Sequence, residues 1–236
     1  AFGFEALNAN TTGSFNTAIG AGALDAATTA DANTAVGNGA LGANTSGNGN
    51  VAVGSNALLV NTTGGSNTAV GHLALDANTT AGNNTAIGKL CMTANTTGDQ
   101  NTAVGSGCLD ANTTGNLNVA MGVAAMGANT TGTQNVAIGY TAMFVNSTGQ
   151  KNTALGYSNL SSNTSGGFNT AVGRSAMNAN TTGSYNVAVG AEALAVQTTD
   201  SNNTAVGYGA LNANVQTNNT AVGYNALANN TTAENN

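Results

Sequence analysis

The chain contains few charged residues, and this scarcity argues against several functions. Only 5% of the 236 residues are charged, against roughly 25% in typical soluble proteins. The basic residues are Lys89, Lys151 and Arg174, and three scattered cations cannot neutralise a row of phosphates. The composition therefore argues against nucleic-acid binding.

Long apolar runs and catalytic clusters are also missing from the sequence. No segment approaches the roughly 18 consecutive apolar residues of a membrane-spanning helix, so we expect no membrane span. The one histidine, His72, has no acid or nucleophile beside it in the sequence pattern, and no Cys/His spacing suggests zinc. We therefore predict a protein that is not an enzyme and that carries no metal and no cofactor.

The sequence consists of one 17-residue repeat. The segment N-[TV]-A-[VIML]-G begins at Asn16, Asn33, Asn50, Asn67, Asn84, Asn101, Asn118, Asn135, Asn152, Asn169, Asn186, Asn203 and Asn219, and every step is the same except the last, which is shorter by one. With a partial copy before Asn16, fourteen copies cover residues 1–236, so we predict a single repeat domain. The chain opens in mid-repeat at Ala1, and we expect a fragment of a longer chain.

The residue types at each position of the repeat, counted from the asparagine, predict a strand, a core and a turn. Position 5 is glycine in all fourteen copies, which indicates a positive φ or a close backbone approach. Position 4 is apolar and position 9 is always Leu or Met, so we expect these two positions to form the core. Position 3 is always alanine and alternates with positions 2 and 4, so it should form a second packed surface. Positions 12 to 15, N-T-T-G, are typical of a turn.

These features predict an all-β protein, a parallel β-solenoid or β-roll of about fourteen coils. The asparagines at position 1 would form a hydrogen-bonded ladder along the axis, or would be plain turn residues. Each coil contributes one Leu and one Val to the core, which falls short of the conformational entropy of ordering a coil. We therefore expect the coils to assemble side by side or end to end into a fibre, as a homo-oligomer or with attached glycan.

Three segments resemble the S-V-A-I-G core of YadA-like trimeric autotransporter adhesin heads. They begin at Asn118, Asn135 and Asn186, and the alanine three residues after the glycine matches as well. Related repeats also resemble those of phage tail fibres. The resemblance implies a β-roll, a trimer of parallel chains and binding to host matrix or to other surfaces. The family's common unit is shorter, so this repeat has a longer turn.

The N-T-T turn is also an N-x-[ST] sequon, so its asparagine is a candidate for glycosylation. The candidates are Asn10, Asn44, Asn61, Asn78, Asn95, Asn112, Asn129, Asn146, Asn163, Asn180 and Asn230. A row of glycans along one edge of the fibre would explain the pattern. Turn chemistry alone would explain it equally.

Two further groups are candidate sites. Position 6 is variable and carries Tyr140, Tyr157, Tyr208 and Tyr224, which would contact a sugar or a partner chain, or pack on the surface. Cys91 and Cys108 both occupy position 8, in successive copies of the repeat. Stacked coils would bring them within reach of a disulfide, unless they are two small apolar residues in place of alanine.

The sequence thus favours a structural or adhesive fibre segment that is extracellular, at a cell surface or part of a virion. Its partners would be other copies of the chain, with a trimer favoured, and carbohydrate or a cell surface. Alternatives are a glycan-coated structural fibril, a phage receptor-binding tail fibre and an ice-binding solenoid. The ice-binding alternative rests on the threonines that occupy position 2 in nine of thirteen copies.

Overall fold

The computed structural model describes residues 1–232 and 234–236, and these residues form a parallel β-solenoid with no helix among them. The predicted fold class and the 17-residue coil are confirmed. Backbone contacts divide the chain into two units, residues 1–118 (unit 1) and residues 119–236 (unit 2).

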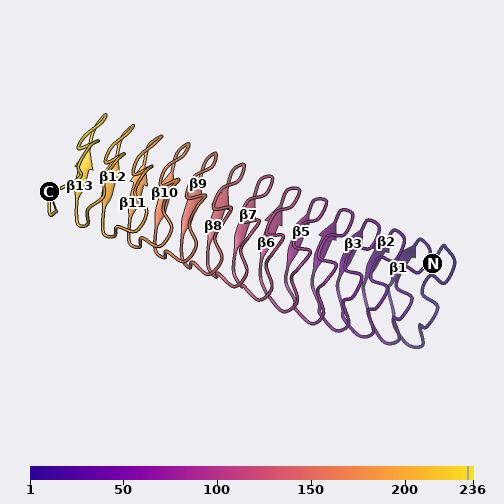
Figure 1. The fold of residues 1–236 in the computed structure, drawn as a ribbon. Coiled ribbons are helices and arrows are strands. Elements are labelled where there is room, and N and C mark those ends of the chain that lie inside the picture. Colours follow the sequence, from indigo (N-terminus) through magenta and orange to yellow (C-terminus); the bar gives the residue numbers. More distant parts are fainter. Residues whose placement is uncertain (233) are drawn as a thin grey trace. The chain divides into compact units, whose positions relative to one another are not determined.

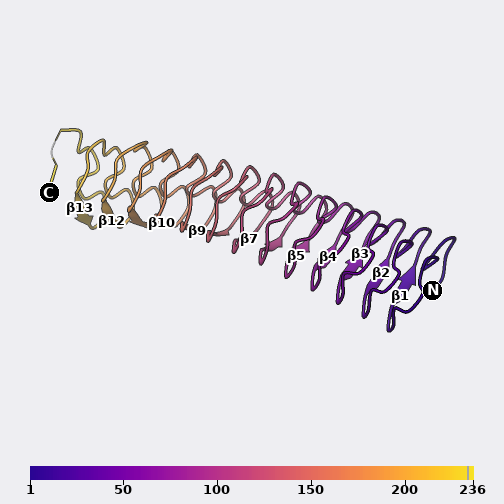
Figure 2. The same ribbon diagram turned by 90° about the horizontal axis from the view of Figure 1, so that it is seen from below.

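Unit 1 contains six strands of three residues each, one in every coil from Asn16 on. They are β1 (Thr17–Ile19), β2 (Thr34–Val36), β3 (Val51–Val53), β4 (Thr68–Val70), β5 (Thr85–Ile87) and β6 (Thr102–Val104). Each strand pairs in parallel with the strand of the next coil, and equivalent residues of the two coils are opposite each other, as Thr17 and Thr34 are. The arrows of this unit occupy the same place in successive coils (Figure 1), and β1 to β5 lie along one side of the coils (Figure 2).

Unit 2 repeats this arrangement with seven strands. They are β7 (Val119–Met121), β8 (Val136–Ile138), β9 (Thr153–Leu155), β10 (Thr170–Val172), β11 (Val187–Val189), β12 (Thr204–Val206) and β13 (Thr220–Val222). The shortened step of the repeat falls between β12 and β13, and yet Thr204 still pairs with Thr220. The shortened copy therefore lacks one residue outside the strand, and the strand register is unchanged.

The interior of both units is built from small or slender side chains. The alanine at position 3 is buried in every strand, as are most residues at positions 8 and 9, for example Leu58 and Met126. Position 9 thus belongs to the core, as predicted. The prediction for position 4 is wrong, because Val53 is 37% and Ile138 40% exposed. The strand turns its alanine inward, and positions 2 and 4 form its outer face.

The glycine at position 5 is required on two grounds, which the sequence indicated as alternatives. Its φ lies between +127° and +143° in every copy, a region that side-chain-bearing residues rarely adopt. A Cβ on Gly71 would also lie 2.4 Å from the carbonyl oxygen of Gly88 in the next coil. Position 5 therefore tolerates no side chain where coils stack this closely.

Two rows of buried asparagines hold successive coils together. At position 1, the backbone N–H of Asn50 donates to Oδ1 of Asn33, and the side-chain amide of Asn50 donates to the carbonyl of Gly64. At position 12, the amide of Asn78 donates to Oδ1 of Asn61 at 2.8 Å. The position-1 ladder confirms the prediction, whereas the position-12 ladder was not foreseen. Amides inside a protein are stable only when such partners satisfy them.

Candidate functional site

The sequon asparagines lie mostly in the interior. Nine of the eleven are fully buried, namely Asn44, Asn61, Asn78, Asn95, Asn112, Asn129, Asn146, Asn163 and Asn180. In these positions the side-chain amide is a donor inside the coil: Asn163 donates to Oδ1 of Asn146 at 2.7 Å and to the carbonyl of Gly166 at 3.0 Å. A sugar linked to such a nitrogen has no room in the folded coil. The geometry favours turn and ladder chemistry at these nine, and the glycosylation hypothesis stays open only for the half-buried Asn10 and Asn230.

The position-12 ladder is interrupted at Ala27 in unit 1, but it extends to a glutamine in unit 2. Gln197 occupies this position in unit 2, and its Nε2 donates to Oδ1 of Asn180 at 3.0 Å. Asn203, in turn, donates to Oε1 of Gln197. Gln197 keeps the bond to the preceding coil although it is not a glycosylation acceptor, so this bond needs a primary amide and not the sequon.

The four candidate tyrosines lie on the surface of unit 2 in two stacked pairs. The rings of Tyr140 and Tyr157 are 5.4 Å apart and nearly parallel, and the rings of Tyr208 and Tyr224 have the same spacing. All four are between 44% and 78% exposed. The structure thus brings together the pairs that adjacent coils predict, on the outside of the fold.

A second aromatic row occupies position 17 of unit 2 and was not foreseen. Phe168 and Tyr185 stack with ring centroids 4.9 Å apart, and the ammonium of Lys151 lies 4.9 Å from the Phe168 centroid. The three residues occupy the same position of successive copies, which is the signal that would have revealed the row. Stacking of this kind contributes about 0.5–1.5 kcal/mol beyond burial, and a cation over an exposed ring contributes about 0.5–1 kcal/mol.

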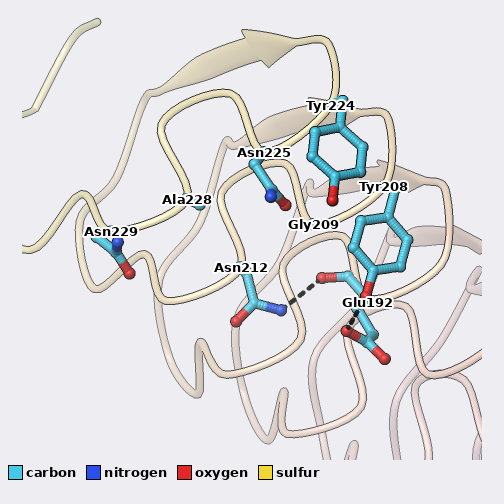
Figure 3. A pocket seen from close by; sticks show the side chains of 8 residues that line it. All are labelled: Glu192, Tyr208, Gly209, Asn212, Tyr224, Asn225, Ala228 and Asn229. Carbon is cyan, nitrogen blue, oxygen red and sulfur yellow. Dashed lines mark hydrogen bonds between the residues drawn. The ribbon is translucent and has the colours of Figure 1, made fainter.

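An open pocket of about 320 Å³ lies beside the second tyrosine pair (Figure 3). The rings of Tyr208 and Tyr224 form one wall, and the side chains of Asn212, Asn225 and Asn229 lie across from them (Figure 3). Gly209 and Ala228 also line the pocket and add little bulk. The pocket therefore combines an aromatic wall with several amides.

Glu192 links the pocket to Arg174, which lies at position 6 of the preceding coil. Its carboxylate forms an ion pair with Arg174 and accepts a hydrogen bond from the hydroxyl of Tyr208 at 3.1 Å. Its backbone carbonyl accepts a hydrogen bond from the amide of Asn212 at 2.9 Å (Figure 3). The hydrogen bond to Glu192 raises the pKa of Tyr208, so its hydroxyl keeps its proton across the neutral range. These contacts hold Tyr208 and Asn212 in place around the pocket.

The two cysteines lie inside unit 1 as thiols, with no disulfide between them in this structure. The Cys91 thiol contacts the carbonyl oxygen of Ala103 at 3.4 Å. The hydrogen bond with Cys108, together with burial, raises the pKa of the Cys91 thiol far above its usual range. A thiolate is the reactive form, so Cys91 is inert here and fills the place of the usual alanine.

Among the described residues, no group of three His, Cys, Asp or Glu side chains is placed to hold a metal ion. A helix long and apolar enough to cross a membrane is likewise not found in this part of the chain. Comparison with protein-family models gave no match, and comparisons with curated proteins and with solved structures gave none either.

Proposed function

We propose that the chain is a structural and adhesive segment of an extracellular fibre, without catalytic activity of its own. The observation that carries this proposal is the axial repetition inside each unit. Within each unit, most coils bury the strand alanine, the Leu or Met at position 9 and one or two asparagines, and successive strands pair in parallel. Such a structure extends by adding coils, as a fibre requires.

Self-association is the second part of the proposal. In each unit, positions 2 and 4 of the strands form an outer face that carries only Thr, Val, Ile, Leu and Met. Val53 in unit 1 and Val189 in unit 2 are each 37% exposed on this face. Exposed apolar rows without charge are typical of association surfaces. The resemblance to trimeric adhesin heads favours three parallel chains in contact through this face.

Sedimentation of the purified chain over a range of concentrations tests the proposal. We expect trimers or longer assemblies, and we expect Val53→Lys and Val189→Lys each to weaken them, because association would bury an unpaired ammonium. Asn38→Lys at the exposed position 6 is the matched control and should leave assembly unchanged. A wild-type chain that stays monomeric, or assembly that both valine variants retain, would contradict the proposal.

The outer face also supports ice binding as a second candidate function. Five of the six strands of unit 1 present Thr at position 2 and Val or Ile at position 4, all in register. A regular, uncharged array of hydroxyl and methyl groups can order water at matching intervals. Thermal hysteresis that is lost in Thr68→Lys would support this function, and its absence in the wild-type chain would exclude it.

A glycan-coated fibril has less support from the geometry. It would need sugars at the N-T-T turns, and nine of those asparagines are buried. The phage receptor-binding alternative rests on the sequence resemblance. Binding of a receptor to the exposed side chains of the coils would test it.

A further inference from the structure

We infer that the pocket beside Tyr208 and Tyr224 binds a neutral pyranose residue of a surface glycan. The inference rests on the adhesive function proposed above and names the class of ligand. Its first support is size, because about 320 Å³ lies at the lower end of the volumes of small-molecule sites. One or two sugar rings match that volume.

The second support is the chemistry of the walls. A pyranose has an apolar C–H face and a rim of hydroxyl groups. The tyrosine wall offers aromatic surface to the C–H face, since Tyr208 remains 44% exposed beside its partner. Each asparagine offers both a donor and an acceptor to the hydroxyls.

The third support is that two of these amides have no protein partner. Among the described residues, the side chains of Asn225 and Asn229 make no hydrogen bond to another residue, and both point to the pocket side shown in Figure 3. The amide of Asn212, by contrast, is held by the Glu192 carbonyl, which aims it. A ligand hydroxyl would therefore meet one amide that is already held and two that have no protein partner.

Charge selects the kind of sugar. Glu192 lines the pocket, and its counterion Arg174 is already engaged by that carboxylate. The chain as a whole carries a formal charge of −6. An acidic sugar would therefore be repelled, while a neutral one meets no such penalty.

The unit contains its own comparison for this inference. Tyr140 and Tyr157 stack at the same 5.4 Å spacing as the pair in the pocket. Glu192 precedes Tyr208 by one coil, and the equivalent residue before Tyr140 is Ala124. No carboxylate therefore anchors this pair. If stacking alone captured sugar, both pairs would bind, and if the pocket is the site, only Tyr208 and Tyr224 would.

Saturation-transfer NMR on the full chain tests the inference. The probes are methyl β-D-glucopyranoside, methyl β-D-galactopyranoside and methyl α-D-mannopyranoside, with galacturonic acid as the acidic control. We expect transfer to the ring protons of at least one neutral glycoside and none to galacturonic acid. In Tyr208→Ala the affinity should fall about tenfold or more, and Asn225→Ala should weaken it less. Tyr140→Ala should bind as the wild type does.

Two results would overturn the site. One is the lack of transfer to all three neutral glycosides in a folded chain, judged by its circular dichroism. The other is binding that Tyr208→Ala and Tyr140→Ala reduce equally, which would indicate unspecific contact with tyrosine. Either result leaves the assembly measured by sedimentation untouched, so failure of the sugar site is distinguishable from failure of the fibre proposal.

Discussion

Position 6 of the repeat differs between the two units, whereas most interior positions do not. Unit 1 mostly presents small or polar residues there, which are Ala21, Asn38, Ser55, His72, Lys89 and Ser106. Unit 2 presents four tyrosines, and all three aromatic stacks recorded among the described residues belong to it. The fold thus fixes what lies inside each coil and leaves position 6 free, so differences in binding are to be sought on the outside of unit 2.

The largest loss of stability is expected from substitutions at position 5, where the backbones of successive coils are in direct contact. Gly71→Ala places a Cβ at φ +139° and 2.4 Å from the Gly88 oxygen, which should cost about 3 kcal/mol or more in unfolding free energy. Gly156→Ala in unit 2 should cost a similar amount, because its φ is +135° and its Cβ would lie 2.8 Å from the Gly173 oxygen. Urea denaturation followed by circular dichroism measures both.

The matched control for these variants is Gly22→Ala at position 7. Its φ is +64°, and nothing lies within 4 Å of the added Cβ, so about 1 kcal/mol is expected. Ala124 already occupies the same position in unit 2 at φ 54°. If the Gly71 variant were no less stable than the Gly22 variant, close backbone contact between coils would not be what requires glycine at position 5.

A smaller loss is expected from the buried amide ladder, again equally in both units. Asn78→Ala in unit 1 and Asn163→Ala in unit 2 each remove an amide that bonds to its own turn and to a neighbouring coil. Each should cost about 1–3 kcal/mol, because buried partners are left unsatisfied. The same denaturation experiment checks this, with the part-buried Thr79→Ala as the milder control. A variant as stable as the wild type would show that the ladder is dispensable.

One coil of unit 2 departs from the shared interior and should gain stability when it is restored. Asn159 occupies position 8, where alanine is usual, and its Oδ1 is buried without a hydrogen-bond partner. Asn159→Ala removes this oxygen and should stabilise the chain by about 1 kcal/mol. A higher midpoint of thermal unfolding is the expected result. A lower midpoint would mean that the bond from its amide to Ala171 outweighs the unpaired oxygen.

The smallest effect is a pH dependence that belongs to unit 1, where both cysteines lie. The hydrogen bond with Cys108 and burial raise the pKa of Cys91, whereas an unfolded thiol has a pKa of about 8.5. The unfolded chain therefore loses its proton first, and the contribution of Cys91 to stability is complete below about pH 8.5 and declines as the pH rises above it. Cys91→Ala should weaken this decline in urea midpoints measured at pH 7 and pH 9. An identical decline in the variant would assign it to other groups.

The period and the glycines of the sequence were enough to predict the coil, its parallel register and the role of position 5. They could not decide which face of the strand points inward, because Ala at position 3 and Val at position 4 are both apolar. The folded coil buries the alanine and leaves position 4 on the outside. The position-12 asparagines were also misleading, since Asn-Thr-Thr is favourable in an exposed turn and in a buried ladder alike.

The surface site was predictable only in part. The repeat pattern placed Tyr208 and Tyr224 in adjacent coils, although the step between them is the shortened one. Nothing in the pattern indicated that Glu192, one coil earlier, accepts the Tyr208 hydroxyl or that asparagines line the other side. Such contacts join different positions of the repeat in successive coils, and the residue types at one position do not predict them.

Cryo-electron microscopy of the native material, at a resolution that shows side chains, tests the fibre proposal most directly. We predict several parallel chains in contact through positions 2 and 4, with both asparagine ladders inside and no sugar density at the nine buried sequon positions. A single chain coated with sugar at the Asn-Thr-Thr turns would contradict the account.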